Sequence, residues 1–332
     1  MATLITGAGL IGSHAARLLV ARGEPTWLYE LKPEPSSIAS VVDPARVGLI
    51  QGDIEDLARL EQVLREHRID RILHTAAYLT AGMRPDLVRG IRTNIIGTVT
   101  VLEAARRAGG RRVVLSSSST VYYAVFDDPA TVPCQEDFAM RVVSQRPESF
   151  YAATKLSVEH LGLLYCDHYG VDVVVIRPAA VLGLSGPVGG ITGRLVRALL
   201  EPALRGEPSV IDDPLLVWRG GDEFVDVRDA AAGGVAALFA EHPQSRVYSI
   251  GTGTLYSFDD FVRAAGEAVP GFQVDVRVKP TGGFAGYRRL RPQPSDIGAA
   301  KRELGWAPRY DLTATMRECA AHLAGRRDER RP

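Results

Sequence analysis

The chain begins with a short apolar run, a glycine-rich turn and an amphipathic stretch, in that order. Ala2–Thr6 predicts a buried strand, Gly7-Ala-Gly-Leu-Ile-Gly12 a tight turn, and Ser13–Arg22 a helix. Glycines in such a turn let the backbone approach a pyrophosphate, which the positive N-terminal end of the following helix attracts. An ordinary glycine-rich turn is the alternative, but the flanking strand and helix favour a dinucleotide-binding unit.

The alternation of strand and helix continues through the first half of the chain. Further strands are expected at Thr26–Glu30, Val47–Gln51, Arg71–Thr75, Arg112–Ser116 and Val171–Ile176. The expected helices between them include one that carries Leu57, Leu60 and Leu64, one from Asn94 to Ala108, and one that begins near Tyr151. This order predicts an α/β fold with a doubly wound parallel sheet of the Rossmann type. Ligands bind such a sheet at the carboxyl ends of its strands.

The sequence pattern changes after Arg177-Pro178, where glycine and proline become frequent. We therefore assign residues 1–178 to an NAD-binding Rossmann domain, and residues 179–223 and 251–325 to a smaller C-terminal substrate lobe. Residues 224–250 contain a helical stretch and the apolar run Val247–Ile250, and they are expected to return to the main sheet. The segment Pro33–Pro44 predicts a loop, and the charged residues 326–332 predict a flexible tail.

Charge and cysteine content exclude several classes of protein. Lys and Arg number 39, as do Asp and Glu, so no basic excess favours nucleic acid or a membrane surface. The three cysteines are isolated, which favours a reducing, cytoplasmic location over a disulfide framework. Neither the cysteines nor the histidines show metal-ligand spacing, so no metal site is expected. No apolar run reaches the length of a membrane span.

The stretch Tyr151-Ala-Ala-Thr-Lys155 places a phenol and an ammonium about one turn apart on one face of a helix. Tyrosine has an ordinary pKa of about 10 and is a poor base at neutral pH, but an adjacent cation lowers that pKa. Such a tyrosine can take a proton from a secondary alcohol or return it to a ketone. Hydroxyls of the run Ser116–Thr120 are candidates to hold the same substrate oxygen. For the motif alone, a chance match is the alternative.

Acidic and small residues at the ends of the next strands suit a dinucleotide. Glu30 follows the glycine turn at close to the spacing of the acid that binds the adenosine ribose, and its charge favours NAD over NADP. Lys32 is a competing cation that could accept a 2′-phosphate. Asp53 is either an adenine contact or the N-cap of the following helix. Ala76-Ala77 leaves room for a cofactor backbone, whereas His74 is expected to be a packed core residue.

A set of motifs runs in order along nearly the whole chain. They are Thr6-Gly-Ala-Gly-Leu-Ile-Gly12, Gly52-Asp-Ile54, His74-Thr-Ala-Ala77, Asn94-Ile-Ile-Gly-Thr98, Ser117-Ser-Ser-Thr-Val-Tyr122, Tyr151-Ala-Ala-Thr-Lys155, Arg177-Pro178, Phe224-Val-Asp-Val-Arg-Asp229, Tyr248-Ser-Ile-Gly251 and Leu304-Gly-Trp-Ala-Pro308. Together they resemble the extended short-chain dehydrogenase/reductase family, in its NAD-dependent epimerase/dehydratase branch, which is UDP-glucose 4-epimerase-like. No single motif is decisive, but the ordered set is specific.

The resemblance implies a role, position by position, for residues of this chain. Tyr151 would be the acid/base, Lys155 would lower its pKa and hold the nicotinamide ribose, and Ser118 would bind the reacting oxygen. The implied NAD contacts are Gly7, Gly9, Leu10, Ile11, Gly12, Glu30, Asp53, Ile54, Thr75, Ala76, Ala77, Asn94, Ser116, Tyr151, Lys155, Pro178 and Ala179. The implied substrate contacts are Ser118, Ser119 and Arg291. A homodimer formed through the helices that begin near Asn94 and Tyr151 is also implied.

Departures from the family pattern bear on the substrate. Ser119-Thr120 stands where dehydratases carry Asp-Glu, Ala180 where nucleotide-sugar enzymes carry an asparagine, and Asp222-Glu223 where they place an arginine. Donors for a diphosphate are therefore missing, although Arg291 and its neighbours are candidates for an anion unless they form a solvated basic loop. The glycine turn is also one residue shorter between Gly7 and Gly9 than is usual.

These departures lead to one interpretation and two alternatives. The first is an NAD-dependent oxidoreductase that transfers hydride reversibly at a secondary alcohol or ketone of a small, polar, non-nucleotide substrate. The second is a nucleotide-sugar 4-epimerase acting through a transient keto intermediate, which the whole-chain similarity favours. The third is a non-catalytic NAD-binding sensor, which the intact set of Ser118, Tyr151 and Lys155 disfavours.

The segment between Ser118 and Tyr151 is longer than the resemblance leads us to expect. Its excess, residues 138–146, mixes apolar residues with Arg141 and Arg146. Because both ends of this segment are fixed at the active site, we expect it to fold over a small substrate and exclude water. A surface elaboration without contact to the pocket is the alternative.

Overall fold

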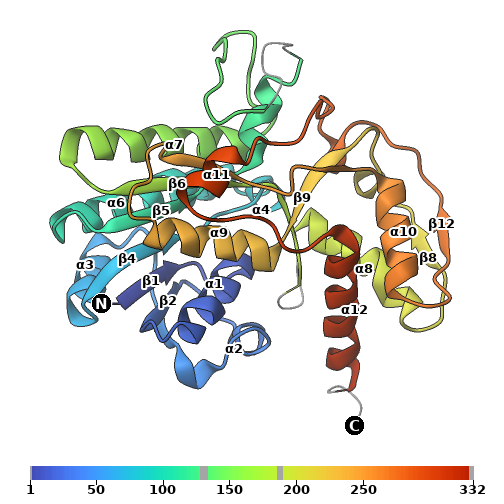
Figure 1. Cartoon of the computed structure of the whole chain (residues 1–332), viewed down its shortest axis with the longest axis horizontal. Coiled ribbons are helices and arrows are strands. Elements are labelled where there is room, and N and C mark those ends of the chain that lie inside the picture. The colour runs from blue at the N-terminus through green and yellow to red at the C-terminus, as the bar shows by residue number, and fades with distance from the viewer. Residues whose placement is uncertain (1, 128–133, 185–189, 329–332) are drawn as a thin grey trace.

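Parallel strands form the central sheet of the computed structural model, which describes residues 2–127, 134–184 and 190–328. The sheet has seven strands in the order β10-β6-β5-β4-β1-β2-β3 (Figure 1). Their bounds are β1 (Ala2–Thr6), β2 (Thr26–Glu30), β3 (Gly48–Gln51), β4 (Ile69–His74), β5 (Arg112–Ser116), β6 (Val173–Pro178) and β10 (Val247–Ile250). The doubly wound α/β fold predicted from the alternation of strands and helices is confirmed.

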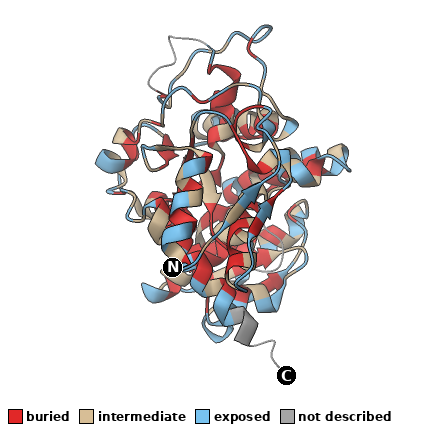
Figure 2. Ribbon diagram, turned by 90° about the vertical axis from the view of Figure 1, so that its right-hand side faces the viewer, coloured by how far each residue is buried: buried red, intermediate tan, exposed pale blue. Residues whose placement is uncertain are grey.

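Helices cover both faces of this sheet, and Figure 2 shows buried residues concentrated along the strands between them. One layer contains α3 (Leu57–Glu66), α6 (Gly97–Arg107) and α7 (Phe150–Tyr169), and the other contains α1 (Leu10–Ala21), α9 (Val227–Phe239) and α11 (Gly298–Glu303). Strands covered on both sides read as continuous apolar runs rather than as alternating patterns. The fully buried valines and isoleucine of β6 follow this rule.

Small residues bring α9 close to the sheet. A side chain at Gly233 would place its Cβ 2.9 Å from atoms of Ile250, and one at Gly234 would lie 3.3 Å from Leu73. The adjacent Ala230 and Ala231 are fully buried. The helix can therefore approach the strands more closely than one with larger side chains.

The remaining elements form a smaller lobe, to the right in Figure 1. It contains a three-stranded sheet of β11 (Leu255–Tyr256), β9 (Asp222–Asp226) and β7 (Ala180–Leu182), and a two-stranded sheet of β12 (Val274–Val276) and β8 (Ser209–Ile211). Its long helices are α8 (Ile191–Ala203), α10 (Phe258–Ala268) and α12 (Leu312–Asp328). An aromatic cluster fills its core, made of Trp218, Phe224, Phe258, Phe261 and Phe284.

Several local expectations differ from the structure. The expected loop at Pro33–Pro44 contains the short helix α2 (Pro35–Ala39), and α12 continues to Asp328, into the expected flexible tail, whose last residues lie outside the described ones. The first residues of the helix expected from Asn94 lie in a π-helical turn, η2 (Arg92–Ile96), and α6 begins only at Gly97. The other short elements are η1 (Pro44–Arg46), α4 (Thr80–Met83), α5 (Leu87–Ile91), η3 (Ser119–Ala124), η5 (Pro214–Leu216) and η6 (Phe284–Gly286).

A helix that crosses a lipid bilayer needs about 20 consecutive, predominantly apolar residues. Within the three described ranges, no helix has both the length and the apolarity needed to cross a membrane.

Candidate active site

The segments that leave the strands at their carboxyl ends lie side by side. The Gly7 amide donates to the Tyr29 carbonyl at 2.8 Å, and the Thr75 amide donates to the Thr6 carbonyl at 2.8 Å. The Ser117 amide donates to the Ile176 carbonyl of β6 at 2.8 Å. These bonds bring the glycine turn, the Thr75–Ala77 segment and the serine run to one edge of the sheet, as the parallel topology predicts.

Two glycines of the turn are required by tight packing, and the third leaves open space. Gly7 has a φ of 94°, and a Cβ at this position would lie 2.6 Å from the Ala76 amide nitrogen. A Cβ at Gly12 would lie 2.0 Å from the Gly7 carbonyl oxygen. Around a Cβ at Gly9, by contrast, no atom of the described residues lies within 4 Å. The backbone at the start of α1 is therefore open to a ligand, and the N-terminal end of this helix would attract a pyrophosphate.

Glu30 lies directly beside this turn. One carboxylate oxygen accepts a hydrogen bond from the Ala8 amide at 3.0 Å, and the other accepts one from the Lys32 amide at 3.2 Å. The carboxylate is thus held at the end of β2, next to the start of α1, where an adenosine ribose would be bound.

Other predicted cofactor contacts have structural partners of their own. Asp53 accepts from the Glu55 amide, but the N-cap of α3 is Asp56, so the N-cap alternative for Asp53 was wrong. Asn94 is buried, and its side-chain amide binds both backbone groups of Tyr78 and the Thr154 hydroxyl on α7. Direct contact between these side chains and NAD stays a prediction.

Ser118, Tyr151 and Lys155 come together at the start of α7. Ser149 caps this helix, which places Tyr151 in its first turn and Lys155 one turn later. The Ser118 hydroxyl lies close enough to the Tyr151 phenol to lower its pKa. The Lys155 amine donates to the Ser116 carbonyl at 2.6 Å and lies 5.6 Å from the centre of the Tyr151 ring. A substrate oxygen at Tyr151 would therefore also reach the serine hydroxyl.

Burial changes the pKa of both titratable groups in this set. Desolvation raises the pKa of Tyr151, the nearby Tyr287 raises it further, and the hydrogen bond with Ser118 lowers it. The sequence predicted the opposite direction, because it shows the cation at Lys155 but not the loss of water around the phenol. The pKa of Lys155 is itself lowered to about 8 by burial, which the charge of Glu159 opposes.

His74 is a core histidine, as predicted. Its Nδ1 lies 2.7 Å from the Thr6 hydroxyl, and its Nε2 lies 2.9 Å from the Thr98 hydroxyl. Burial and, to a smaller extent, the charge on Lys155 lower the pKa of His74 to about 3. The imidazole is therefore neutral, and both of its nitrogens have hydrogen-bond partners.

Sequence comparison matches residues 3–251 to the NAD dependent epimerase/dehydratase family. The chain belongs to this family. A UDP-glucose 4-epimerase from Corynebacterium glutamicum is 28% identical over 337 aligned residues, which cover 96% of this chain and 94% of that protein. The resemblance stated from the motifs is thereby confirmed.

Solved structures agree with this assignment. A UDP-glucose 4-epimerase from Stenotrophomonas maltophila, with bound NAD and formylated UDP-arabinopyranose, is 26% identical with a TM-score of 0.81, covering 99% of both chains. An L-threonine dehydrogenase from Cupriavidus necator shares the fold at 24% identity and a TM-score of 0.77, covering 97% of this chain and 100% of that one. The family is NAD-dependent and several of its structures hold NAD, which confirms the predicted cofactor.

Arg291, predicted as a substrate contact, is buried and paired with acids. Its Nη2 donates to Glu223 at 2.6 Å and to the Ser295 hydroxyl at 2.7 Å, and its Nη1 lies 3.7 Å from Asp222. The alternative of a solvated basic loop was therefore wrong for this residue. Its role in binding substrate stays a prediction, and the pairing with Glu223 weighs against it.

Tyr287 is a neighbour of the site that the sequence did not reveal. Its hydroxyl lies 3.4 Å from the Ser149 hydroxyl, and its proximity raises the pKa of Tyr151. Its ring stacks on Tyr123, with centroids 4.2 Å apart, and the Tyr123 hydroxyl donates to Asp222. Tyrosines therefore connect the surroundings of Tyr151 with the acids that face Arg291. No motif marks this contact between distant residues.

Residues 138–146 were expected to fold over the substrate, but they do not form such a lid in the structure. Val142 and Val143 are about 80% and 79% exposed, and the loop before α7 extends from the top of the molecule in Figure 1. The base of the segment is anchored, because Phe138 packs against Tyr122 with ring centroids 5.3 Å apart. The described conformation therefore agrees with the alternative, a surface elaboration.

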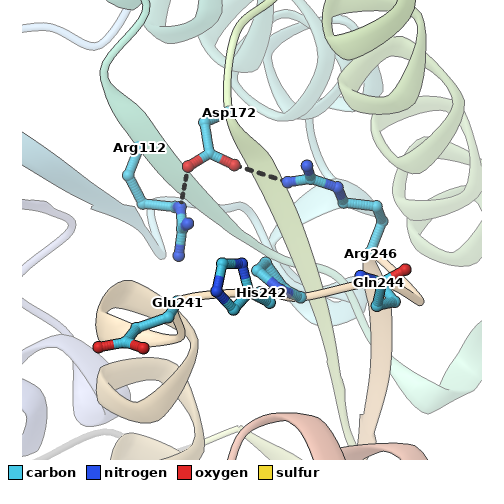
Figure 3. A pocket seen from close by; sticks show the side chains of 7 residues that line it. Arg112, Asp172, Glu241, His242, Gln244 and Arg246 are labelled. Carbon is cyan, nitrogen blue, oxygen red and sulfur yellow. Dashed lines mark hydrogen bonds and ion pairs between the residues drawn. The ribbon is translucent and has the colours of Figure 1, made fainter.

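A cavity of about 350 Å³ lies at the opposite edge of the sheet, near the amino ends of β5, β6 and β10. Figure 3 shows Asp172 between Arg112 and Arg246, and their ion pairs measure 2.5 and 2.6 Å. The two guanidinium groups already share this carboxylate. None of the predicted site residues lines the cavity, so it is separate from the candidate active site.

The lowered pKa of Lys155 predicts that the stability difference between the native protein and Lys155→Met depends on pH. Below about pH 8 the amine is charged in both the folded and unfolded states, so its burial destabilises the fold. Between about pH 8 and pH 10.5 the unfolded chain binds the proton more tightly, so the free energy of unfolding rises with pH. Relative to Lys155→Met, the unsubstituted protein should gain roughly 2–3 kcal/mol over this window.

Urea unfolding of both proteins at the two ends of the window measures this gain. Substitution of the exposed Lys301 by Met is the control and should give no such difference. A stability difference between the native protein and Lys155→Met that stays constant with pH would contradict the lowered pKa.

Proposed function

We propose that this protein is an NAD-dependent oxidoreductase that transfers hydride reversibly at a secondary alcohol or ketone. The observation that carries the proposal is the placement of Ser118 beside Tyr151, with Lys155 one turn away at the same edge of the sheet. The open glycine turn and the Glu30 carboxylate support NAD binding at that edge. Bound NAD would supply the hydride acceptor, or NADH the donor.

The residues of this set have complementary tasks. Ser118 holds the substrate oxygen, and Tyr151 takes the hydroxyl proton as the carbinol hydrogen leaves with its electron pair. In the reverse direction, Tyr151 returns the proton to the ketone oxygen. The raised pKa of Tyr151 keeps the phenol protonated and suits this reductive direction. The Lys155 ammonium favours the phenolate that the oxidative direction needs.

The substrate proposed for this site is small, polar and not a nucleotide. Nucleotide-sugar recognition needs donors for two phosphates, and Arg291 is already bound to Glu223. Ala180 offers no side-chain donor. The second candidate is a nucleotide-sugar 4-epimerase, which is favoured by the similarity of nearly the whole chain to such enzymes.

The domain division and the location are proposed together with this function. Residues 179–223 and 251–325 would form the substrate lobe beside the NAD-binding domain, because they surround a separate apolar cluster. The described cysteines are free thiols, which supports the expected cytoplasmic location.

Substitution of Tyr151 by Phe tests the acid/base role. The variant keeps the ring but loses the proton-carrying hydroxyl, so turnover should fall roughly 10²–10⁴-fold while NAD affinity stays nearly unchanged. The assay is NADH formation with simple polyols, hydroxy acids and UDP-sugars, after bound cofactor has been identified. Near-normal turnover in this variant would remove the central claim. Epimerisation of a UDP-sugar without net NADH would favour the second candidate.

The preference for NAD depends, in this proposal, on Glu30. Replacement by Ala removes the ribose acceptor and the bond to the Ala8 amide, so NAD should bind about ten- to a hundredfold more weakly, with a smaller gap to NADP. Calorimetric titration with both cofactors measures this. Glu34→Ala, at an exposed position nearby, is the matched control. If the unsubstituted protein binds NADP more tightly than NAD, Lys32 rather than Glu30 governs the choice between the two cofactors.

A homodimer through η2, α6 and α7 is proposed as the assembly. Large apolar side chains are exposed on these elements, namely Ile96, Phe150, Leu164 and Tyr169. Leu164→Glu should convert the dimer to a monomer in light scattering coupled to size-exclusion chromatography, because it would bury a charge. Val210→Glu, at an exposed apolar position in β8, should leave the dimer intact. A native protein that is already monomeric would refute this assembly.

A further inference from the structure

Beneath the catalytic set lies a buried ion pair that the proposed mechanism does not use. Glu159 of α7 and Arg177 of β6 are 2% and 5% exposed. Arg177 contacts both carboxylate oxygens, its Nε at 2.9 Å and its Nη2 at 2.7 Å. Two charges taken out of water together are costly unless other groups complete their hydrogen bonds. The surrounding contacts show which groups do so here.

Glu159 is tied to the serine run that carries the proposed substrate contact. The Ser117 hydroxyl donates to the same Glu159 oxygen that receives the Arg177 Nε. Ser117 stands between Ser116, whose carbonyl accepts a hydrogen bond from the Lys155 amine, and Ser118, which lies beside Tyr151. One carboxylate therefore fixes the backbone between both of these contacts.

Arg177 extends the network to other elements. Its Nη1 donates to the Tyr122 hydroxyl at 3.0 Å and to the Glu136 carbonyl at 2.8 Å. The Tyr122 hydroxyl also lies 2.9 Å from the Ser249 hydroxyl of β10. The ion pair is thus built into the packing of β5, β6, β10 and η3, and its position is closely defined.

Glu159 also stands one helical turn from Lys155, on the same face of α7. Its charge opposes the effect of burial on the pKa of Lys155. The other titratable groups facing these two residues are His74 from β4, Tyr151 on α7 and Arg177 from β6. His74 is neutral and Tyr151 is protonated at neutral pH, and Arg177 adds only positive charge. Glu159 is the negative charge among them.

We propose that Glu159 is a positioning residue of the hydride-transfer site. It holds the Ser116–Ser118 backbone through Ser117, and it keeps Lys155 charged so that the amine can bind the nicotinamide ribose. This inference rests on the function proposed above, in which Lys155 contacts NAD.

The pH dependence of NAD binding tests this role. NAD has no group that titrates near neutral pH, so affinity measured by calorimetry from about pH 6 to about pH 10 follows the protonation of Lys155. In the native protein affinity should fall above about pH 8. In Glu159→Gln, which keeps the shape but not the charge, the midpoint of this fall should move about one pH unit lower.

Two further variants separate charge from geometry. Ser117→Ala removes the hydrogen bond and leaves the ion pair, so NAD should bind about two- to tenfold more weakly with an unmoved midpoint. Glu303→Gln is the matched control, because Glu303 also accepts from serine and tyrosine hydroxyls but lies away from the site. This substitution should change neither the affinity for NAD nor the midpoint of its pH dependence.

The charge of Arg177 is left without its partner in Glu159→Gln, which can prevent folding. The double variant Glu159→Gln/Arg177→Met removes both charges and should fold, with a midpoint between those of the native protein and Glu159→Gln, because loss of the Arg177 charge offsets part of the loss of Glu159. An unmoved midpoint in the Glu159 variants, even with uniformly weaker binding, overturns the proposal. Lys155→Met should remove the pH dependence. If Lys155→Met instead keeps the native pH dependence of NAD binding, the proposed role of Lys155 in binding NAD fails as well. This variant therefore distinguishes a failure of the Glu159 proposal from a failure of the proposed function.

Discussion

The burial of the Lys155 ammonium is the constraint around which the active site is arranged. A charged amine in apolar surroundings tends to lose its proton, and burial lowers the pKa of Lys155 to about 8. The Ser116 carbonyl solvates the amine, and Glu159 supplies an opposing charge. The neighbouring His74 adds no second cation, because burial keeps it neutral. The site therefore keeps a positive charge beside Tyr151 without the solvent that normally supports one.

This arrangement depends directly on the order of the strands. Ser116 ends β5, His74 ends β4, and Arg177 lies near the end of β6, so these three residues meet only because β4, β5 and β6 are neighbours in the sheet. Helix α7 then lays Tyr151, Lys155 and Glu159 across the same edge. The parallel fold thus determines the electrostatics of the site as well as its location.

The sequence predicted those features that depend on neighbouring residues. The bounds of β1, β2, β5 and β10 agree with the expectations, because each is an apolar run ended by turn-forming or polar residues. The glycine turn was found in the same way. Pairings between distant residues were not predicted, among them Arg291 with Glu223 and Tyr287 with Tyr123. These depend on how the smaller lobe packs against the sheet.

The direction of the pKa shift at Tyr151 shows the same limit in chemical terms. A lysine four residues away is visible in the sequence and favours the phenolate. The water that burial removes from the phenol is not visible there, and its loss is the larger effect. Local spacing therefore identified the residues of the candidate site but not the balance of forces that acts on them.

In the function proposed above, substrate choice depends on charge pairing in the smaller lobe rather than on the catalytic set. Epimerases and dehydrogenases of this fold require the same proton and hydride transfers, so Ser118, Tyr151 and Lys155 do not distinguish them. Arg291 has a single guanidinium group, and Glu223 is completely buried against it. If Arg291 turned to bind a diphosphate, Glu223 would remain as a buried carboxylate without its ion-pair partner, which is strongly destabilising. In this chain the ion pair therefore opposes any movement of Arg291 that would separate its guanidinium group from Glu223.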